Sequence, residues 1–299
     1  SYHMATSRFM IVDDYYFPMY VVKPRAGTEF IQVWHAAGAF KKFGLSTVGK
    51  LYGPSNQYLR HVPVHSNYSR VYVSSNEVIP FYAEAFGMSA DKIYPLGLPR
   101  TDFFLKEGNR EKVKEKFFNM YPNLFGKQII LYAPTFRGKS NYQGKFAAPI
   151  DFGEMSRQLP DGYRLLVHLH PYMRNGLELN PEVTDFVYLI ENDFTIEELL
   201  IVSDILITDY SSVIFDYSLL EKPIAFFVND LEDYLKERDF YYDYEEMVPG
   251  PIFNEMDQLI RWVQNPVYDK EKMKAFKNQF FNELDGKATE RIVQHLFND

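Results

Sequence analysis

The chain has 299 residues, more than one hydrophobic core usually serves, so its length predicts two domains. Its net charge of −8 argues against a general nucleic-acid-binding protein, although a local basic cluster could still meet an anionic substrate. The sequence contains no cysteine, which excludes disulfide bonds and thiolate chemistry. No apolar run in it approaches the roughly 20 residues of a membrane span.

Short apolar runs alternate with helical periodicity along the chain, which is typical of an α/β fold with parallel sheets. The apolar runs predict strands at residues 9–13, 30–34, 71–75, 92–97, 128–135, 163–170, 186–190, 204–209 and 223–228. The periodic segments predict helices at residues 77–86, 110–120, 195–203, 212–221, 255–264, 269–284 and 287–298.

This order predicts two α/β lobes. We expect a first lobe at 5–105, a linking helix segment at 106–127 and a second lobe at 128–280, followed by a C-terminal helix at 281–299 that could cross back to the first lobe. Open α/β sheets bind ligands beyond the carboxyl ends of their strands. The polar residues at the predicted strand ends are therefore the candidates for function, and a cleft between the lobes is the expected site.

The stretch IQVWHAAGAFKKFG places His35 at the end of an apolar run, with only small residues following it. Such a histidine is either a core residue before a turn or a catalytic base, since an imidazole titrates near neutral pH. Gly38 could expose an amide to an anion. Lys41 and Lys42 form either a solvated face or a phosphate contact.

Two later strand ends carry basic groups. In YAPTFRGK, Thr135 and Arg137 could hold a phosphate, or the segment could be an ordinary basic loop. In LLVHLHPY, His170 lies nearer the predicted strand end and is the functional candidate, whereas His168 is expected to be structural. A zinc site is disfavoured because no third ligand stands nearby at a suitable spacing.

The segment ILITDYSSVIFDY is the strongest local signal. A buried strand leads through Thr208 and Asp209 to Ser211 and Ser212 at the start of a helix, where main-chain N–H groups favour a phosphate. An ordinary helix cap would need only one such residue. Further on, Arg238 is either a surface ion-pair partner or a substrate clamp.

The motifs QVWHAAGAFKKFG, YAPTFRG, HLHP, ITDYSSVIFDY, KPIAFF and PGPI, in this order, resemble the CDP-glycerol glycerophosphotransferases of wall teichoic acid synthesis over nearly the whole chain. The resemblance implies a GT-B-like fold of two Rossmann-type lobes. No cofactor is expected, and the candidate groups could hold a phosphate without a dedicated metal site, although metal dependence stays open. It implies transfer of glycerol 3-phosphate from CDP-glycerol to a lipid-linked acceptor, with release of CMP. WHAAGAFKKFG looks closest to the priming members, whose acceptor is a polyprenyl-diphosphate-linked N-acetylmannosaminyl-N-acetylglucosamine disaccharide.

The resemblance also implies roles for the candidates. His35 matches the general base and His170 the second essential histidine. The implied donor-binding residues are Thr135, Arg137, Thr208, Asp209, Ser211, Ser212 and Arg238, and the acceptor-side residues are Gly38, Lys41 and Lys42.

The lipid-linked acceptor implies a peripheral position on the cytoplasmic face of the membrane. Segment 103–125 could contribute to this contact, or it could be a packing helix. Family members carry more chain before the first strand, so the first lobe is expected to be incomplete at its N-terminus. The alternatives are a polymerase or second-step glycerol or ribitol phosphate transferase, a GT-B sugar transferase using a UDP-sugar, and a noncatalytic nucleotide-binding protein. Self-association stays open.

Overall fold

The computed structural model describes residues 2–50, 53–136, 148–170, 173, 177 and 179–298. Its chain divides into two compact units. Unit 1 comprises Ser1–Leu105, Glu232–Tyr244 and Lys277–Asp299, and unit 2 comprises Lys106–Leu231 and Glu245–Phe276. Three helices lie where the chain passes between the units: α10 (Leu231–Glu237), α11 (Tyr244–Met247) and α13 (Lys270–Phe280).

Unit 1 is built on a parallel sheet with the strand order β1-β2-β3-β4. Its strands are β1 (Phe9–Val12), β2 (Glu29–Gln32), β3 (Arg70–Tyr72) and β4 (Ile93–Tyr94). Its helices are α1 (Tyr2–Thr6), α2 (Phe17–Val21), α3 (Asn56–His61), α4 (Ile79–Phe86), α5 (Pro99–Leu105) and α14 (Ala288–Asn298).

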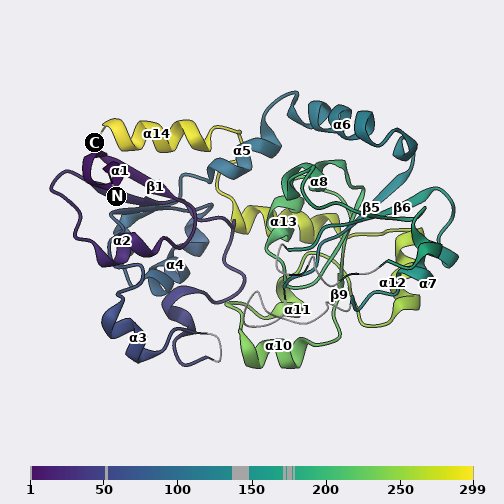
Figure 1. The fold of residues 1–299 in the computed structure, drawn as a ribbon, viewed down its shortest axis with the longest axis horizontal. Coiled ribbons are helices and arrows are strands. Elements are labelled where there is room, and N and C mark those ends of the chain that lie inside the picture. Colours follow the sequence, from purple (N-terminus) through teal and green to yellow (C-terminus); the bar gives the residue numbers. More distant parts are fainter. Residues whose placement is uncertain are drawn as a thin grey trace. The chain divides into compact units, whose positions relative to one another are not determined.

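The C-terminal helix completes the core of unit 1. Ile292 and Leu296 of α14 pack in one buried cluster with Ile31 of β2 and Tyr72 of β3. Figure 1 shows α14, in yellow, beside the first elements of the chain. The helix that ends the chain is therefore part of the same unit as the strands that begin it.

Unit 2 is built on a six-stranded parallel sheet with the order β10-β9-β8-β5-β6-β7. Its strands are β5 (Gln128–Tyr132), β6 (Tyr163–Val167), β7 (Val187–Leu189), β8 (Ile205–Thr208), β9 (Ile224–Phe227) and β10 (Ile252–Phe253). Its helices are α6 (Asn109–Met120), α7 (Phe152–Gln158), α8 (Ile196–Val202), α9 (Val213–Ser218) and α12 (Met256–Gln264).

The strand order of unit 2 reverses between β5 and β8. The chain moves outward from β5 through β6 to β7, returns to place β8 on the other side of β5, and then continues through β9 to β10. This is the order of a Rossmann-type sheet, and its topological switch point lies where β5 pairs with β8. Ligands of such sheets bind beyond the carboxyl ends of the strands at this point.

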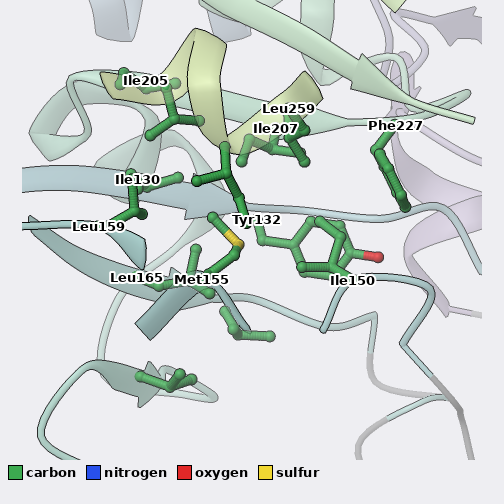
Figure 2. Close-up of a cluster of buried hydrophobic side chains, with 14 of the residues drawn as sticks. Ile130, Tyr132, Ile150, Met155, Leu159, Leu165, Ile205, Ile207, Phe227 and Leu259 are labelled. Atoms are coloured by element: carbon green, nitrogen blue, oxygen red, sulfur yellow. The ribbon is translucent and has the colours of Figure 1, made fainter. Parts of the chain in front are cut away.

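The core of unit 2 holds its strands in place. Ile130 of β5, Leu165 of β6 and Ile207 of β8 are fully buried and pack with Met155 of α7 and Leu259 of α12 (Figure 2). Strands buried on both faces read as continuous apolar runs, which explains why the sequence marks these strands so clearly.

The predicted α/β class with parallel sheets is confirmed, and every predicted strand is present. The strands end one to three residues earlier than expected. β6 ends at Val167, so His168 and His170 lie after it and do not share a strand face.

The predicted helix 110–120 is α6, which buries Val113 and Phe117 and pairs Lys116 with Glu198 at 2.7 Å. These contacts favour a packing role for segment 103–125.

One segment differs from the expected lobes. Residues 232–244 belong to unit 1, although they were expected within the lobe 128–280. The main-chain N–H of Tyr241 donates to the Phe40 carbonyl at 3.0 Å, and the ring of Phe240 lies 4.8 Å from that of Phe40. Residues 277–280 also belong to unit 1. Among the described residues, no helix is both long and apolar enough to cross a bilayer.

Candidate active site

The carboxyl ends of β1 and β2 bring together the polar groups of unit 1. Asp13 and Asp14 follow β1 directly, while His35 lies three residues beyond Gln32, the last residue of β2. β1 and β2 are neighbouring parallel strands, so the segments that follow them emerge at the same edge of the sheet. His35 therefore lies on the loop after β2. The expected position at the tip of the strand is wrong.

The imidazole of His35 is held by the loop that follows β1. Its Nδ1 lies 2.9 Å from the main-chain oxygen of Asp13 and 3.8 Å from a carboxylate oxygen of Asp14. Because a carbonyl oxygen can only accept, Nδ1 carries the hydrogen and Nε2 is left with its lone pair. The side chain is 47% exposed. This arrangement suits a general base, since Nε2 can accept a proton while Asp14 stabilises the imidazolium that forms.

The backbone conformation of Trp34 directs the chain away from the sheet just before His35. Its φ is +50°, which is a strained conformation for a bulky residue. The indole is 8% exposed, and its ring stacks on Phe43 at 4.9 Å and on the His35 imidazole at 4.5 Å. The packing of Trp34 therefore maintains the strained backbone that presents His35 to solvent.

Gly38 has a different role from the one expected for its amide. Its φ is +70°, and its N–H donates to the Ser74 hydroxyl at 3.1 Å. The Tyr82 hydroxyl donates to the Gly38 carbonyl at 3.1 Å. The expectation that this amide faces an anion is wrong, because the amide is hydrogen-bonded inside the fold. Its place on the acceptor side stays a prediction.

Lys42 is paired within unit 1. Its ammonium group lies 2.9 Å from a carboxylate oxygen of Asp239, and that of Lys50 lies 2.9 Å from the same oxygen. The neighbouring Lys41 forms an isolated antiparallel bridge with Phe240. These contacts fix segment 232–244 on unit 1, so the charge of Lys42 is used in the fold. A phosphate contact of Lys41 stays a prediction.

At the switch point of unit 2, hydrogen bonds join the segment after β5 to the end of β8. Asp209, which follows β8, accepts the main-chain N–H of Thr135 at 2.8 Å. The Thr208 hydroxyl donates to the Ala133 carbonyl at 2.7 Å, and Thr208 is fully buried. The expectation that Thr208 contacts the donor is therefore wrong, because its side chain points between the strands. Asp209 is 4% exposed and holds the two strand ends together, instead of facing an anion that its charge would repel.

The two histidines after β6 have different surroundings. His168 Nδ1 lies 2.9 Å from the Ile190 carbonyl, so this ring is tied to the segment after β7. His170 is exposed, and its ring centroid lies 5.8 Å from that of Phe136, which follows β5. Because β5 and β6 are adjacent, His170 shares the edge of the sheet that carries Thr135.

Ser211 and Ser212 stand at the start of α9, at the same edge. The Ser211 hydroxyl accepts the main-chain N–H of Val213 at 3.4 Å, and Ser212 is the N-cap residue. Both serines are partly exposed. The structure thus brings Thr135, His170 and the two serines to the carboxyl edge of adjacent strands. Their contact with a donor phosphate stays a prediction.

Two arginines complete the predicted donor residues. Arg137 lies outside the described residues. Arg238 follows α10 in the segment that belongs to unit 1, and its main-chain N–H donates to the Tyr234 carbonyl at 2.9 Å. A role of either arginine on the diphosphate stays a prediction.

In the part of the chain that the structure describes, no three His, Asp or Glu side chains are grouped as ligands of a metal ion.

Sequence reasoning missed the partners of His35. The letters FMIVDD show two acids after a strand, and this signal could have identified Asp13 and Asp14. The guanidinium of Arg100, at the start of α5, donates to the His35 carbonyl at 3.1 Å. Gln32 was missed because a single polar residue in an apolar run has no distinctive pattern.

Comparison with known proteins agrees with this architecture. The chain is 46% identical over 297 residues to the teichoic acid ribitol-phosphate primase of Bacillus spizizenii, covering 99% of this chain and 76% of the primase. It is 33% identical over 297 residues to the teichoic acid glycerol-phosphate primase of Bacillus subtilis, covering 99% and 75%. A structure of the wall teichoic acid polymerase TagF, soaked with CDPG, superposes with a TM-score of 0.81 at 29% identity over 98% of this chain and 73% of that one.

Each of the two α/β units contains a parallel sheet, and the sheet of unit 2 has a Rossmann-type switch point. These features define a GT-B-like fold. The family model described as CDP-Glycerol:Poly(glycerophosphate) glycerophosphotransferase matches residues 1–298. The chain belongs to this family of phosphotransferases. It spans only about half of the ribitol-phosphate polymerases that it also matches, with coverage of 47 to 57%.

The pairing of Asp239 gives a prediction for stability. Partial burial alone would raise the pKa of Asp239, but hydrogen bonds from Lys42 and Lys50 outweigh this effect and lower it to about 2. Since the unfolded carboxyl has a pKa of about 3.9, the contribution is present above pH 4 and is lost as the pH falls through 2. We expect Asp239→Asn to lower the free energy of unfolding by about 1 kcal/mol at pH 7, after allowing for solvent screening.

Urea unfolding of both proteins between pH 7 and pH 3 checks this. The difference between wild type and Asp239→Asn should fall to roughly half by pH 3. Asparagine suits the comparison because it tolerates the φ of +79° at this position. Asp233→Asn is the control, since its pair with Lys236 is largely exposed, and it should leave the free energy unchanged. A difference for Asp239→Asn that is independent of pH would contradict the ion pair.

Proposed function

We propose that the protein transfers a polyol phosphate from a CDP-activated polyol to a hydroxyl of a polyprenyl-diphosphate-linked disaccharide, in teichoic acid synthesis. The observation that carries this proposal is His35, whose Nδ1 donates to Asp13 and whose Nε2 is thereby a proton acceptor, in a chain of this phosphotransferase family. His170, Thr135 and the serines before α9 are the groups proposed for the donor diphosphate.

The proposed step is an in-line displacement at the β-phosphorus. The acceptor oxygen forms a bond to this phosphorus, the bond to the bridging oxygen of CMP breaks, and CMP leaves with that electron pair. The acceptor proton passes to Nε2 of His35. Such transfers depend on positioning and on neutralising the phosphate oxygens, which hydroxyls, main-chain N–H groups and histidine can do.

The donor polyol is either glycerol or ribitol. The motifs resembled the glycerol phosphate primases, and the family model is named for glycerophosphate. The higher identity to a ribitol-phosphate primase, 46% against 33%, favours ribitol. We therefore propose a priming transferase and place CDP-ribitol ahead of CDP-glycerol as the donor. Repeated addition, as by a polymerase, is the second candidate, because polymerases also match this chain over 99% of its length.

Mass spectrometry of the products tests this proposal. A synthetic polyprenyl-diphosphate disaccharide is incubated with CDP-ribitol, CDP-glycerol or a UDP-sugar. We expect one ribitol phosphate to be added and CMP to be released. Addition of glycerol phosphate alone would reassign the polyol, and a ladder of products would indicate a polymerase. Transfer from the UDP-sugar, or from none of the donors, would overturn the proposal.

The role of His35 is tested separately by substitution. We expect His35→Ala to lower kcat by at least about 100-fold, because the acceptor hydroxyl loses its base. Binding of CMP, measured by calorimetry, should stay within about twofold, since the proposed donor groups belong to unit 2. His61→Ala replaces an exposed histidine of the same unit and should transfer at the wild-type rate. Near-normal turnover of His35→Ala would show that another group takes the proton.

A surface of unit 1 is our candidate for the membrane contact that a lipid-linked acceptor requires. Between residues 16 and 22, four large apolar side chains are 39 to 53% exposed. They are Tyr16, Phe17, Val21 and Val22. Lys23 and Arg25 follow and are exposed, as suits an interface with anionic lipid. This segment comes directly after the acids that contact His35, so it would place the membrane near the proposed base.

Flotation with phosphatidylglycerol vesicles tests this surface. We expect Phe17→Ser combined with Val21→Ser to reduce the bound fraction by roughly tenfold, since each change removes apolar area from the interface. Phe125→Ser combined with Val267→Ser is the matched control, because both residues are exposed in unit 2. Equal loss of binding in both double variants, or none in the first, would exclude this segment.

A further inference from the structure

Gln32 is a polar side chain with no exposed surface, at the last position of β2. Burial of an amide is unfavourable unless its hydrogen-bonding groups find partners. Its Nε2 donates to the main-chain oxygen of Asp14 at 3.1 Å and to the Tyr68 hydroxyl at 2.9 Å. Its Oε1 accepts the main-chain N–H of Trp34 at 2.8 Å. Both amide hydrogens and the amide oxygen are therefore used.

These bonds join the two loops on which the orientation of His35 depends. Asp14 belongs to the loop after β1, which supplies the Asp13 oxygen to the imidazole. Trp34 belongs to the loop after β2 and precedes His35. The Gln32 amide thus contacts the chain one residue from each end of the hydrogen bond between His35 Nδ1 and Asp13.

The bond to Trp34 also acts on the strained backbone. A residue keeps an unfavourable φ only where its surroundings determine it. The indole stacking on Phe43 fixes the side chain of Trp34, while Gln32 Oε1 fixes its N–H. Loss of the acceptor would leave a buried N–H unsatisfied and allow the peptide before His35 to rotate.

A second layer holds Gln32 itself. The Tyr68 hydroxyl that accepts from Gln32 also lies 2.8 Å from the Tyr20 hydroxyl and 3.0 Å from Nδ1 of His65. His65 is 1% exposed, and burial lowers its pKa to about 3, so its ring is neutral near pH 7. The groups that face the Gln32 amide therefore carry no charge that titrates near neutral pH.

We propose that Gln32 is a positioning residue for His35, and that its amide joins Asp14 to Trp34 so that the imidazole keeps its hydrogen on Nδ1 and its lone pair on Nε2. The inference rests on the proposed function, in which His35 is the base. It predicts that an apolar residue of the same length at position 32 would preserve the packing but release the imidazole.

Gln32→Met is the variant to test, because methionine is close to glutamine in volume and lacks the hydrogen bonds. The matched control is Gln128→Met, which replaces an exposed glutamine at the start of β5. We expect Gln32→Met to lower kcat by about 10- to 100-fold, with the KM for donor and acceptor within about twofold. The control should match wild type.

Nitrogen-15 NMR of the histidine side chains gives a readout that does not depend on activity. His35 should show a protonated Nδ1 in the wild type at pH 8, and a substantial Nε2–H population in Gln32→Met. The resonances are assigned from their loss in His35→Asn. Gln32→Glu, which keeps an acceptor for Trp34, should show an intermediate loss and serves if Gln32→Met does not fold.

The outcomes separate this inference from the proposed function. An unchanged kcat and an unchanged tautomer in Gln32→Met would overturn the positioning role, even if His35→Asn is inactive. A loss that appears only in KM would also overturn it. If no CDP-polyol is a donor for wild type, but the tautomer changes in Gln32→Met, then the proposed function fails and the positioning role stands.

Discussion

A main-chain carbonyl can accept a hydrogen bond but cannot donate one, and this limit fixes the chemistry of His35. The Asp13 oxygen lies 2.9 Å from Nδ1, so the free lone pair must be on Nε2. The bond exists because β1 and β2 pair in a register that places Val12 beside Gln32. A slip of one residue would turn the side chains that follow to the other face of the sheet. The pairing of two short strands therefore determines which imidazole nitrogen can act as a base.

Unit 2 uses the carboxyl ends of its strands in a different way. There an aspartate side chain, not a carbonyl, joins the segments after β5 and β8, since Asp209 accepts the Thr135 N–H. A nearly buried carboxylate beside a phosphate would be repulsive, so its value lies in holding the rim at the switch point. Ser211 and Ser212, without charge, then stand where a phosphate could bind. In each unit, the residues that fix the geometry thus differ from those that we propose to contact a substrate.

The sequence predicted the strands because buried parallel strands leave continuous apolar runs, but it placed His35 at the tip of β2 and not on the loop that follows. It did not predict what orients His35, since the acceptor is a main-chain oxygen that no side chain reveals. Thr208 was misjudged for a related reason: a hydroxyl at a strand end can face the neighbouring strand as readily as a ligand. The place of segment 232–244 depends on the pair between Lys42 and Asp239, 197 residues apart. A pairing at that distance leaves no periodic pattern to read.

The polar network formed by Gln32, Tyr68, Tyr20 and His65 indicates which property is important at this site. Apolar side chains would stabilise the interior at least as well as buried amides and hydroxyls, but they cannot fix the direction of a neighbouring group. The network also includes unfavourable features. His65 has a φ of +66°, and its buried Nε2 has no hydrogen-bond partner among the described residues. Such a group costs roughly 1 to 3 kcal/mol. Strain at His65 and at Trp34, in one cluster beneath one histidine, is consistent with a site in which orientation matters more than stability.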